Sequence, residues 1–332
     1  MLLITGGSGF IGKYLSAHIL LNTSDKIRIF SSSPDKFHTG LENILLSAIN
    51  HILHLGSTGF YSKDLIDNAK IRYKNRQSII TENLELVQGD ITDQTNLQDS
   101  IEGVNTVIHA AGILNPRRER TLEKVNYYGT KNLLDVMLQN NIQPLINIGI
   151  LGTSPNPKLR FHYSKWKSEE AIKNSGIQFK LFKSSLVLGA EDNFTKKISR
   201  TISLPSIFFP FPKSKESFFQ PILVNDLATA VLSCLQSKSS ESSTYEIGGP
   251  EYFSFQEMVR IYLDKFNKKR LLVPVPQKLL LPPVKILELI MEEPFLTQEE
   301  LQGLSQKNIA DLDSVNRFFG FSPLTIKENL IL

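Results

Sequence analysis

The feature that most constrains the fold of this chain is a glycine-rich segment close to its start. Residues 5–12 read TGGSGFIG, so glycines stand at positions 6, 9 and 12, between a short apolar run and an amphipathic stretch. Glycine lets a strand turn tightly into a helix and lets the backbone approach a phosphate, which the helix N-terminus attracts with its N–H groups and its dipole. The segment therefore predicts a phosphate-binding turn of the kind that holds dinucleotides.

Short apolar runs and helix-length stretches alternate over the first 188 residues. The helical stretches include 129–140 and 164–174, and the apolar runs are 2–5, 26–31, 84–88, 106–110, 144–149 and 179–188. Buried strands separated by helices are typical of a parallel sheet covered on both faces. The pattern predicts an α/β fold, a doubly wound Rossmann sheet with helices on both faces.

The chain has 332 residues, about twice the typical domain length, which leaves room for a second unit. We expect residues 1–187 to form a dinucleotide-binding domain. We expect residues 188–332, which are richer in proline, phenylalanine and serine, to form a smaller C-terminal α/β lobe for a substrate or a partner.

Residues 37–80 interrupt the alternation, because connections between a strand and a helix usually take about 2–6 residues. Thr39 and Glu42 have the spacing of a capping box, and Gly56 suits a helix stop. One helix face between them is apolar: Leu41, Ile44, Leu45, Ala48, Ile49, Ile52 and Leu53. We expect this helical insertion to fold back on its own domain; the alternative is a docking element for a partner or a membrane surface.

Composition and charge exclude several classes of function. The chain has 37 basic and 33 acidic side chains, and its net charge of +4 is too small to indicate a nucleic-acid partner. Its one cysteine, Cys234, has no partner for a disulfide and no companions for a zinc site. His51 and His54 lack a companion ligand nearby in the sequence, so we expect a polar helix face there and no metal site.

The ends and the hydropathy of the chain bear on its location. No basic segment with a cleavable apolar core opens the sequence, and no run approaches the roughly 18 apolar residues of a membrane span. We expect no transmembrane segment and a cytoplasmic location, or its equivalent in a plastid stroma or matrix. Peripheral association with a membrane stays open.

The end of the second strand selects the form of the dinucleotide, because a carboxylate there binds the ribose hydroxyl of NAD, whereas basic or small polar groups accept the phosphate of NADP. No carboxylate immediately ends this strand. The candidates for holding a phosphate are Ser31, Ser32, Ser33 and Lys36. We therefore favour NADP, and Asp35 keeps NAD as the alternative.

Several further segments resemble the extended and atypical short-chain dehydrogenase/reductase superfamily, the NAD-dependent epimerase/dehydratase-like proteins. The segments are TGGSGFIG (5–12), QGDITD (88–93), HAAG (109–112), VNYYGTKNLL (125–134), QPILVNDLA (220–228) and YEIGGP (245–250). The tail, at 271–276, 294–297 and 319–321, is similar to one branch, the dinucleotide-binding accessory subunit of respiratory complex I and its bacterial homologues.

The resemblance implies a set of cofactor-binding residues. They are Thr5, Gly6, Ser8, Gly9, Phe10, Ile11 and Gly12 of the turn, the serines and Lys36 named above, Asp90 and Ile91, Ala110, Ala111 and Gly112, and Lys165.

The superfamily's chemistry uses a tyrosine as acid/base, a lysine four residues later, and a serine or threonine that polarises the substrate carbonyl. Spacing alone offers Tyr163 with Lys167. The family block instead aligns on Ser164, Lys165 and Glu169. That register, which we favour, puts Phe161 in the place of the tyrosine. The strand before it should end in the serine, and Gly149 stands there. Asn126 and Lys165 remain, and Tyr163 stays a candidate acid/base.

These departures predict an NAD(P)-binding protein with a degenerate active site and a structural or assembly role in a membrane-bound redox complex. The alternative is an active NAD(P)-dependent reductase, epimerase or dehydratase that acts on a nucleotide sugar or a hydrophobic carbonyl compound. It would use Tyr163 with Lys165 or Lys167, and Thr153 or Ser154 in place of the serine. A third reading is a redox sensor whose partner binding depends on NADP(H).

Overall fold

A parallel seven-stranded sheet forms the centre of the computed structural model, which describes residues 1–116, 120–213, 218–237, 239–291, 294–304 and 308–330. The strand order is β11-β6-β5-β4-β1-β2-β3, and each pair of neighbouring strands is parallel. The strands are β1 (Leu2–Thr5), β2 (Ile27–Ser31), β3 (Leu84–Gln88), β4 (Thr106–His109), β5 (Leu145–Ile150), β6 (Phe179–Ser184) and β11 (Ser243–Ile247). The predicted doubly wound α/β fold is confirmed.

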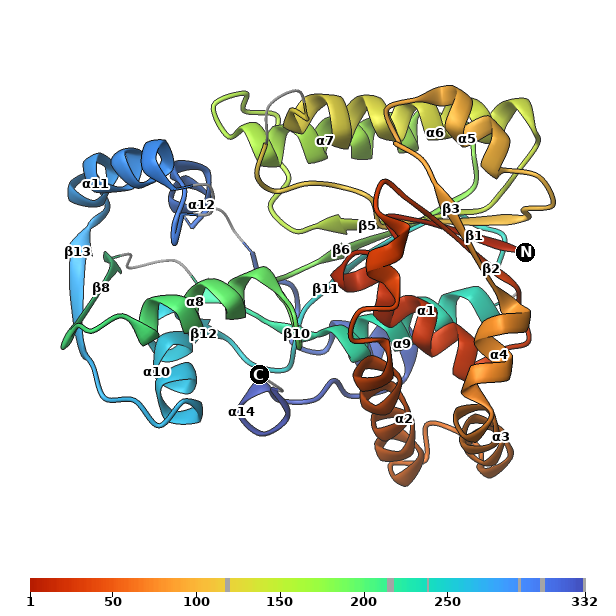
Figure 1. Ribbon diagram of the computed structural model, residues 1–332, viewed down its shortest axis with the longest axis horizontal. Helices are drawn as coiled ribbons and strands as arrows, with labels where there is room; N and C mark the ends of the chain where they lie inside the picture. The colour runs from red at the N-terminus through yellow and green to blue at the C-terminus, as the bar shows by residue number, and fades with distance from the viewer. Residues whose placement is uncertain (117–119, 214–217, 238, 292–293, 305–307, 331–332) are drawn as a thin grey trace.

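Helices cover both faces of the sheet (Figure 1). Helices α1 (Phe10–Asn22) and α9 (Val224–Gln236) pack on one face, and α5 (Gln94–Ser100), α6 (Gly129–Gln139) and α7 (Arg160–Lys173) lie on the other. Because both faces are covered, β1 is buried along its whole length, and Ile4 lies level with Ile29 of β2 and Ile108 of β4. After β1 the chain adds β2 and β3 on one side of β1, and it then crosses back to add β4, β5 and β6 on the other side. The topological switch point therefore lies between β1 and β4.

Three helices follow β2 and the short turn η1 (Pro34–Phe37): α2 (Leu41–Ser57), α3 (Lys63–Lys74) and α4 (Arg76–Asn83). The apolar face of α2 is buried in the same core as α1 and α9, so the insertion folds back on its own domain. The docking alternative fails for this face, because its side chains are already covered.

Two local expectations for α2 are wrong. The helix begins after Gly40, which has a left-handed backbone (φ 72°) and provides no side-chain cap, so Thr39 and Glu42 form no capping box. Glu42 pairs instead with Arg76 of α4. His51 belongs to no polar face: it is 4% exposed, and its Nε2 lies 2.8 Å from Oδ1 of Asp226 on α9.

Many residues beyond 186 form a smaller lobe, at the left of Figure 1, with its own apolar core, whereas α9 and β11 belong to the main sheet and the helices that cover it. Its strands pair two by two: β7 (Val187–Leu188) with β10 (Ile222–Leu223), β9 (Phe218–Phe219) with β12 (Phe253–Ser254), and β8 (Phe208–Lys213) with β13 (Leu271–Pro276). Its helices are α8 (Asn193–Ser203), α10 (Phe255–Lys265), α11 (Gln277–Ile290), α12 (Gln298–Gly303) and α14 (Ile326–Asn329). Helix α13 (Ser314–Phe319) packs back on α9 and β11 of the main sheet.

Within the described ranges, no helix has both the length and the apolar character that crossing a bilayer requires.

Candidate functional site

The turn between β1 and α1 can be built only from glycine at two of its positions. Gly6 has φ +69°, and a Cβ added to it would lie 2.6 Å from Cα of Ala111. A Cβ on Gly12 would lie 2.5 Å from Cα of Gly7. The first helical N–H groups after Gly9 receive no side-chain cap, so they remain available to an anion.

The turn lies at the switch point of the sheet, where parallel α/β folds bind their ligands. Ala110, Ala111 and Gly112 follow β4 and lie opposite the turn, since a Cβ on Gly6 would meet the Ala111 backbone. The place where the turn and these three residues face each other is called the crevice below. Of the remaining predicted turn residues, Thr5 is fully buried, while Phe10 packs edge-on against Tyr14.

The end of β2 is joined to the glycine turn by a pair of serines. Ser8 Oγ lies 2.5 Å from Ser31 Oγ, which also accepts a hydrogen bond from Ser33 N. Ser32 and Lys36 are exposed, and so is Asp35 within η1. Ser31 therefore holds the local backbone, whereas Ser32 and Lys36 present their polar groups to the outside.

Asp90 follows β3, and both of its carboxylate oxygens already have partners. Oδ1 accepts hydrogen bonds from N and Oγ1 of Thr92, and Oδ2 lies 2.7 Å from Nη1 of Arg120. Ile91 is 4% exposed and packs against Gly129, so it supports α6 rather than facing a ligand. No sequence signal pointed to Arg120, because it lies outside the family segments.

Asn126 and Lys165 come together beside Gly112. Asn126 is buried in η2 (Glu123–Tyr128); its Oδ1 accepts a hydrogen bond from Ile113 N (2.8 Å), and its Nδ2 donates to Ser164 Oγ (3.0 Å). A Cβ on Gly112 would lie 2.7 Å from Lys165 Nζ and 3.2 Å from Asn126 Oδ1. The amide and the ammonium group therefore border the same point of the crevice.

The structure does not bring Tyr163 and Lys167 to that point. Lys167 Nζ lies 2.6 Å from Glu123 Oε1 and 4.0 Å from the ring centre of Tyr127, both on η2. The Tyr163 ring stacks on Trp166, with the ring centres 5.8 Å apart. This pair therefore faces η2, on a different side of α7 from Lys165.

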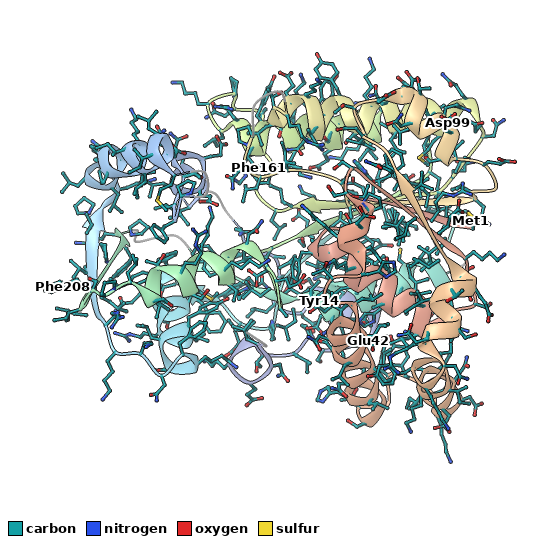
Figure 2. The ribbon with its side chains drawn as sticks, in the orientation of Figure 1. Met1, Tyr14, Glu42, Asp99, Phe161 and Phe208 are labelled. Atoms are coloured by element: carbon teal, nitrogen blue, oxygen red, sulfur yellow. The ribbon has the colours of Figure 1, made fainter. Side chains whose placement is uncertain are left out.

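Neither position that the favoured register assigns to proton transfer carries a hydroxyl. Phe161, labelled in Figure 2, stands one helical turn before Lys165 on α7. Its backbone N–H donates to Oε1 of Glu299 in α12 (2.5 Å). Gly149 lies near the end of β5 and lines the pocket described next. A phenyl ring and a hydrogen atom cannot donate or accept a proton.

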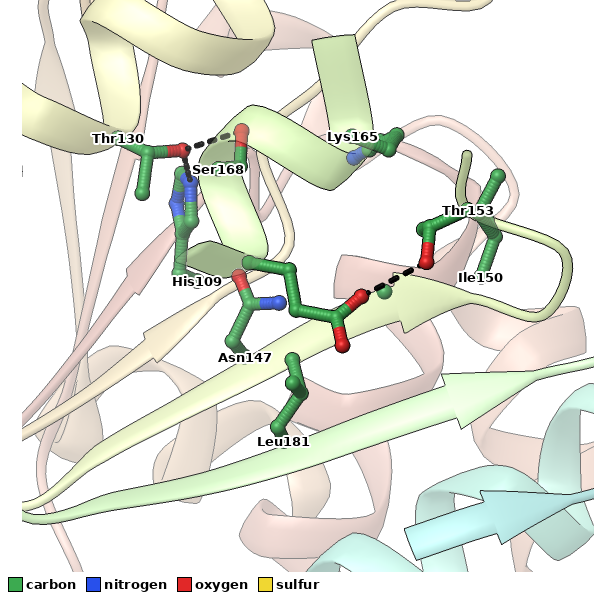
Figure 3. A pocket seen from close by; sticks show the side chains of 10 residues that line it. His109, Thr130, Asn147, Ile150, Thr153, Lys165, Ser168 and Leu181 are labelled. Atoms are coloured by element: carbon green, nitrogen blue, oxygen red, sulfur yellow. Dashed lines mark hydrogen bonds between the residues drawn. The ribbon is translucent and has the colours of Figure 1, made fainter. Parts of the chain in front are cut away.

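A small polar pocket lies beside Lys165 (Figure 3). Its free volume, about 10 Å³, is close to what one water molecule needs. It is lined by His109, Thr130, Asn147, Gly149, Ile150, Thr153, Lys165, Ser168, Glu169 and Leu181. Thr153 Oγ1 donates its hydrogen to Glu169 Oε2 (2.9 Å), so this hydroxyl already has a partner within the pocket. Asn147 and Ser168 were missed because neither belongs to a family segment or a spacing motif. Thr130 and Glu169 do lie in segments that resemble the family, but those segments assigned them no place in this pocket.

Burial sets the charge states in this pocket. His109 bridges Thr5 Oγ1 (2.6 Å) and Thr130 Oγ1 (3.0 Å), as expected for a packed, hydrogen-bonded histidine. Burial and the neighbouring Lys165 lower the pKa of His109 to about 3, so its ring is neutral. Burial also lowers the pKa of Lys165 to about 8. Lys165 thus remains mostly a cation at neutral pH, in a site where an anionic or polar ligand would stabilise its charge.

Known proteins share both the sequence pattern and the fold. The profile of the 3-beta hydroxysteroid dehydrogenase/isomerase family matches residues 3–269. The chain is 27% identical over 180 residues to NADH dehydrogenase (ubiquinone) 1 alpha subcomplex subunit 9, mitochondrial, of Dictyostelium discoideum, covering 54% of this chain and 49% of that protein. The protein of the same name from Arabidopsis thaliana is 26% identical over 189 residues, with 56% and 47% covered. The chain thus spans about half the length of these curated relatives.

Two solved structures show the fold along almost the whole chain. The NADPH-dependent quinone oxidoreductase QOR2 of Escherichia coli, complexed with NADPH, has a TM-score of 0.67 at 13% identity, with 99% of this chain and 98% of that chain covered. MoeE5, in complex with UDP-glucuronic acid and NAD, has a TM-score of 0.66 at 15% identity, with 99% and 95% covered. The fold is therefore that of NAD(P)-binding Rossmann proteins.

Proposed function

Because the chain belongs to the 3-beta hydroxysteroid dehydrogenase/isomerase family, we propose that it binds NAD(P) and uses the dinucleotide to stabilise its fold rather than to turn over a substrate. A ligand that binds only the folded state stabilises it by mass action, by about 4 kcal/mol at a thousandfold excess over its Kd. A dinucleotide can therefore be retained after the family's hydride transfer has been lost.

The chain's own residues suit such a ligand. The pyrophosphate would lie against the backbone of Gly6, Gly9 and Gly12 and the uncapped start of α1. Ala110, Ala111 and Gly112 would border it from β4, and Lys165 would meet the far end of the dinucleotide beside Asn126. Asp90 would lie near the adenine, with Arg120 beside it.

NADP is the form that the end of β2 favours. Ser32 and Lys36 are exposed there and can accept a ribose phosphate, whereas Ser31 is occupied by Ser8. Asp35 lies one residue before Lys36 in η1 and is the group that would favour NAD.

One observation carries the loss of catalysis: Lys165, and not Lys167, lies beside Asn126 at the crevice. With the lysine so fixed, Phe161 and Gly149 occupy the two positions that need a hydroxyl. We infer that the site positions a nicotinamide without supplying the proton that carbonyl reduction requires.

The relatives suggest the setting of such a protein. Both curated relatives named above are subunits of NADH dehydrogenase by name. We therefore propose a structural or assembly role in a membrane-bound redox complex. The proposed location is the cytoplasm, or its equivalent in a plastid stroma or matrix, at the periphery of a membrane.

A second candidate function is an active NAD(P)-dependent reductase, epimerase or dehydratase, and one observation favours it. Thr153 lies in the same pocket as Lys165, and its Oγ is oriented by Glu169. To donate to a carbonyl of a nucleotide sugar or a hydrophobic substrate, this hydroxyl would have to turn its one hydrogen away from Glu169, and the site would still lack an acid/base at Phe161.

The deciding experiment is to purify the chain without added nucleotide, denature it, and identify what is released. A near-stoichiometric amount of NADP(H) supports a retained structural cofactor. Release of NAD(H) alone contradicts the preference for NADP. An empty protein that oxidises NADPH with carbonyl substrates would replace the proposal by the second candidate.

A further inference from the structure

Helix α11 exposes apolar side chains that a folded protein normally covers. Leu289 is 84% exposed, Ile290 72%, Leu279 66% and Ile286 58%, whereas only Val284 of this helix is fully buried. Isolated exposed leucines are common on protein surfaces, but four on one fourteen-residue helix form a patch that calls for a covering surface.

The exposed residues share one side of the helix. At 3.6 residues per turn, Leu279, Ile286 and Ile290 project within a narrow arc, and the two prolines of the helix project beside them. Val284 projects from the opposite side, where α11 packs on α12, β8 and β13. Helix α11 is thus apolar on its inner side and on its outer side.

The charges of α11 are divided between these two sides. Lys278 and Lys285 are exposed, lie seven residues apart, and follow one margin of the outer side. Glu288 turns inward, where its Oε1 accepts a hydrogen bond from the backbone N–H of Gln298 (2.9 Å). The outer side of α11 therefore combines hydrocarbon with positive charge alone.

The same end of the molecule carries more groups of both kinds. Helix α11, β8 and β13 lie together at one extremity, and Phe208 projects there (Figures 1 and 2). Phe208 is 57% exposed and its partner in the ladder, Leu271, is 58% exposed. Lys268 and Lys269, just before β13, are exposed as well.

We propose that α11 lies flat on an anionic lipid bilayer, with Leu279, Ile286, Leu289 and Ile290 in the headgroup–acyl boundary and its two lysines on the lipid phosphates. An outward apolar stripe bordered by lysines is the composition of helices that rest in a membrane interface. The outer side of α11 carries two lysines and no acid, so its charge is complementary to a surface of negative phosphates. The inference goes beyond the proposed function, because it concerns a surface remote from the glycine turn.

The test is flotation of the full 332-residue chain with vesicles of phosphatidylcholine and phosphatidylglycerol, with and without NADP. The parent protein is expected to float with these vesicles equally well in both conditions, because α11 is not part of the dinucleotide site. If the chain bound vesicles only with NADP present, the two sites would not be independent. If the chain bound vesicles but did not bind NADP, only the proposed function would be contradicted.

Variants of α11 locate the contact. Ile286→Glu with Leu289→Glu is expected to lower the vesicle partition coefficient about a hundredfold, since it replaces two apolar side chains that would be buried in the bilayer. Lys278→Gln with Lys285→Gln is expected to lower it by about fivefold for each lysine, and only on anionic vesicles. Ile71→Glu, at a 59% exposed position on α3, is the matched control and should bind like the parent.

Three results would overturn the proposal. The first is a parent chain that stays in solution at every lipid concentration, which would leave the face to a protein partner. The second is an Ile286→Glu/Leu289→Glu variant that binds as the parent does. The third is a parent dimer in sedimentation that this variant dissociates, which would assign the face to a second copy of the chain. All variants change exposed side chains, and circular dichroism verifies that they fold.

Discussion

At the scale of single residues, Lys165 decides how the site is read. Spacing alone offers Lys167 with Tyr163, whereas the register that we favour, from the family block, offers Lys165. In the structure, Lys165 Nζ borders Gly112 and Asn126, whereas Lys167 Nζ pairs with Glu123 at 2.6 Å. The two lysines are two residues apart on α7, so they project to different sides of the helix.

The two lysines provide a matched pair of variants. Lys165→Ala is expected to weaken binding of NADP by about tenfold to a hundredfold, because it removes a partly desolvated cation from the crevice. Lys167→Ala is expected to leave the affinity within about twofold, because it removes only a surface ion pair. Titration calorimetry measures both. The reverse order would restore the register of Tyr163 with Lys167.

The glycine turn allows a second comparison at this scale. Gly6→Ala places a Cβ against the Ala111 backbone at a positive φ, whereas Gly59→Ala meets no atom within 4 Å at φ +84°. Gly59→Ala should cost about 1 kcal/mol of the free energy of unfolding, from backbone strain alone. Gly6→Ala should cost about 1–3 kcal/mol more, from the added contact, and should abolish NADP binding. Equal urea midpoints for the two variants would show that the close approach at Gly6 is not maintained.

At the scale of elements, strands were predicted more accurately than helix ends. The runs at 2–5 and 84–88 coincide with β1 and β3. Strand β1 is buried along its whole length and leaves an unbroken apolar run in the sequence. Strand β3 lies at the edge of the sheet and mixes apolar residues with exposed polar ones, Glu85 and Gln88. The predicted capping box at the start of α2 was wrong, because Gly40, with a left-handed backbone, occupies the N-cap position in place of Thr39. His51 was misread for a different reason: its partner, Asp226, lies 175 residues away, and no local pattern reports such a contact.

That contact ties α2 to α9 and predicts a large effect on stability. Asp226 accepts from the backbone N–H of Leu324 (3.0 Å) as well as pairing with His51, and it is fully buried. Asp226→Ala leaves both groups without a partner and is expected to lower the free energy of unfolding by about 3–5 kcal/mol. Glu123→Ala, which removes the exposed partner of Lys167, should lower it by about 1 kcal/mol or less. Urea unfolding compares the two; similar losses would mean that α2 is not held to α9 through Asp226.

At the scale of the whole molecule, two buried histidines make stability depend on pH. Burial lowers the pKa of His18 to about 3, with help from His51, and that of His109 to about 3. An unfolded chain binds these protons near pH 6.5, so the stabilisation is complete above that pH and is lost as the pH falls toward 3.

The expected loss between pH 7.5 and pH 5.5 is about 1.4 kcal/mol for each of these histidines. Urea unfolding at the two pH values measures it. His109→Gln should lower the dependence by about 1.4 kcal/mol, the contribution of that one histidine. A dependence that persists in full in His109→Gln would show that the His109 ring takes up a proton without unfolding.

The sequence predicted the molecule's overall plan and part of its site, for physical reasons that differ. Covered strands and the glycine turn are local patterns, so the sheet and its crevice could be predicted. The pocket of Thr130, Asn147 and Ser168 is assembled from α6, β5 and α7, and contacts between distant elements leave no spacing to recognise. The division at 187/188 remains a prediction.

The place of β11 in the sheet has a consequence for how the chain is made. On a ribosome, β6 emerges about 60 residues before β11 and about 40 residues before α9, the helix that packs against α1. At the usual rate of synthesis this interval lasts several seconds, during which β6 is an open edge of the sheet and the part of α1 that α9 later covers is exposed. A nascent chain of this protein therefore exposes this edge and this part of α1 until α9 and β11 have emerged, and a chain cut near residue 188 would keep both exposed.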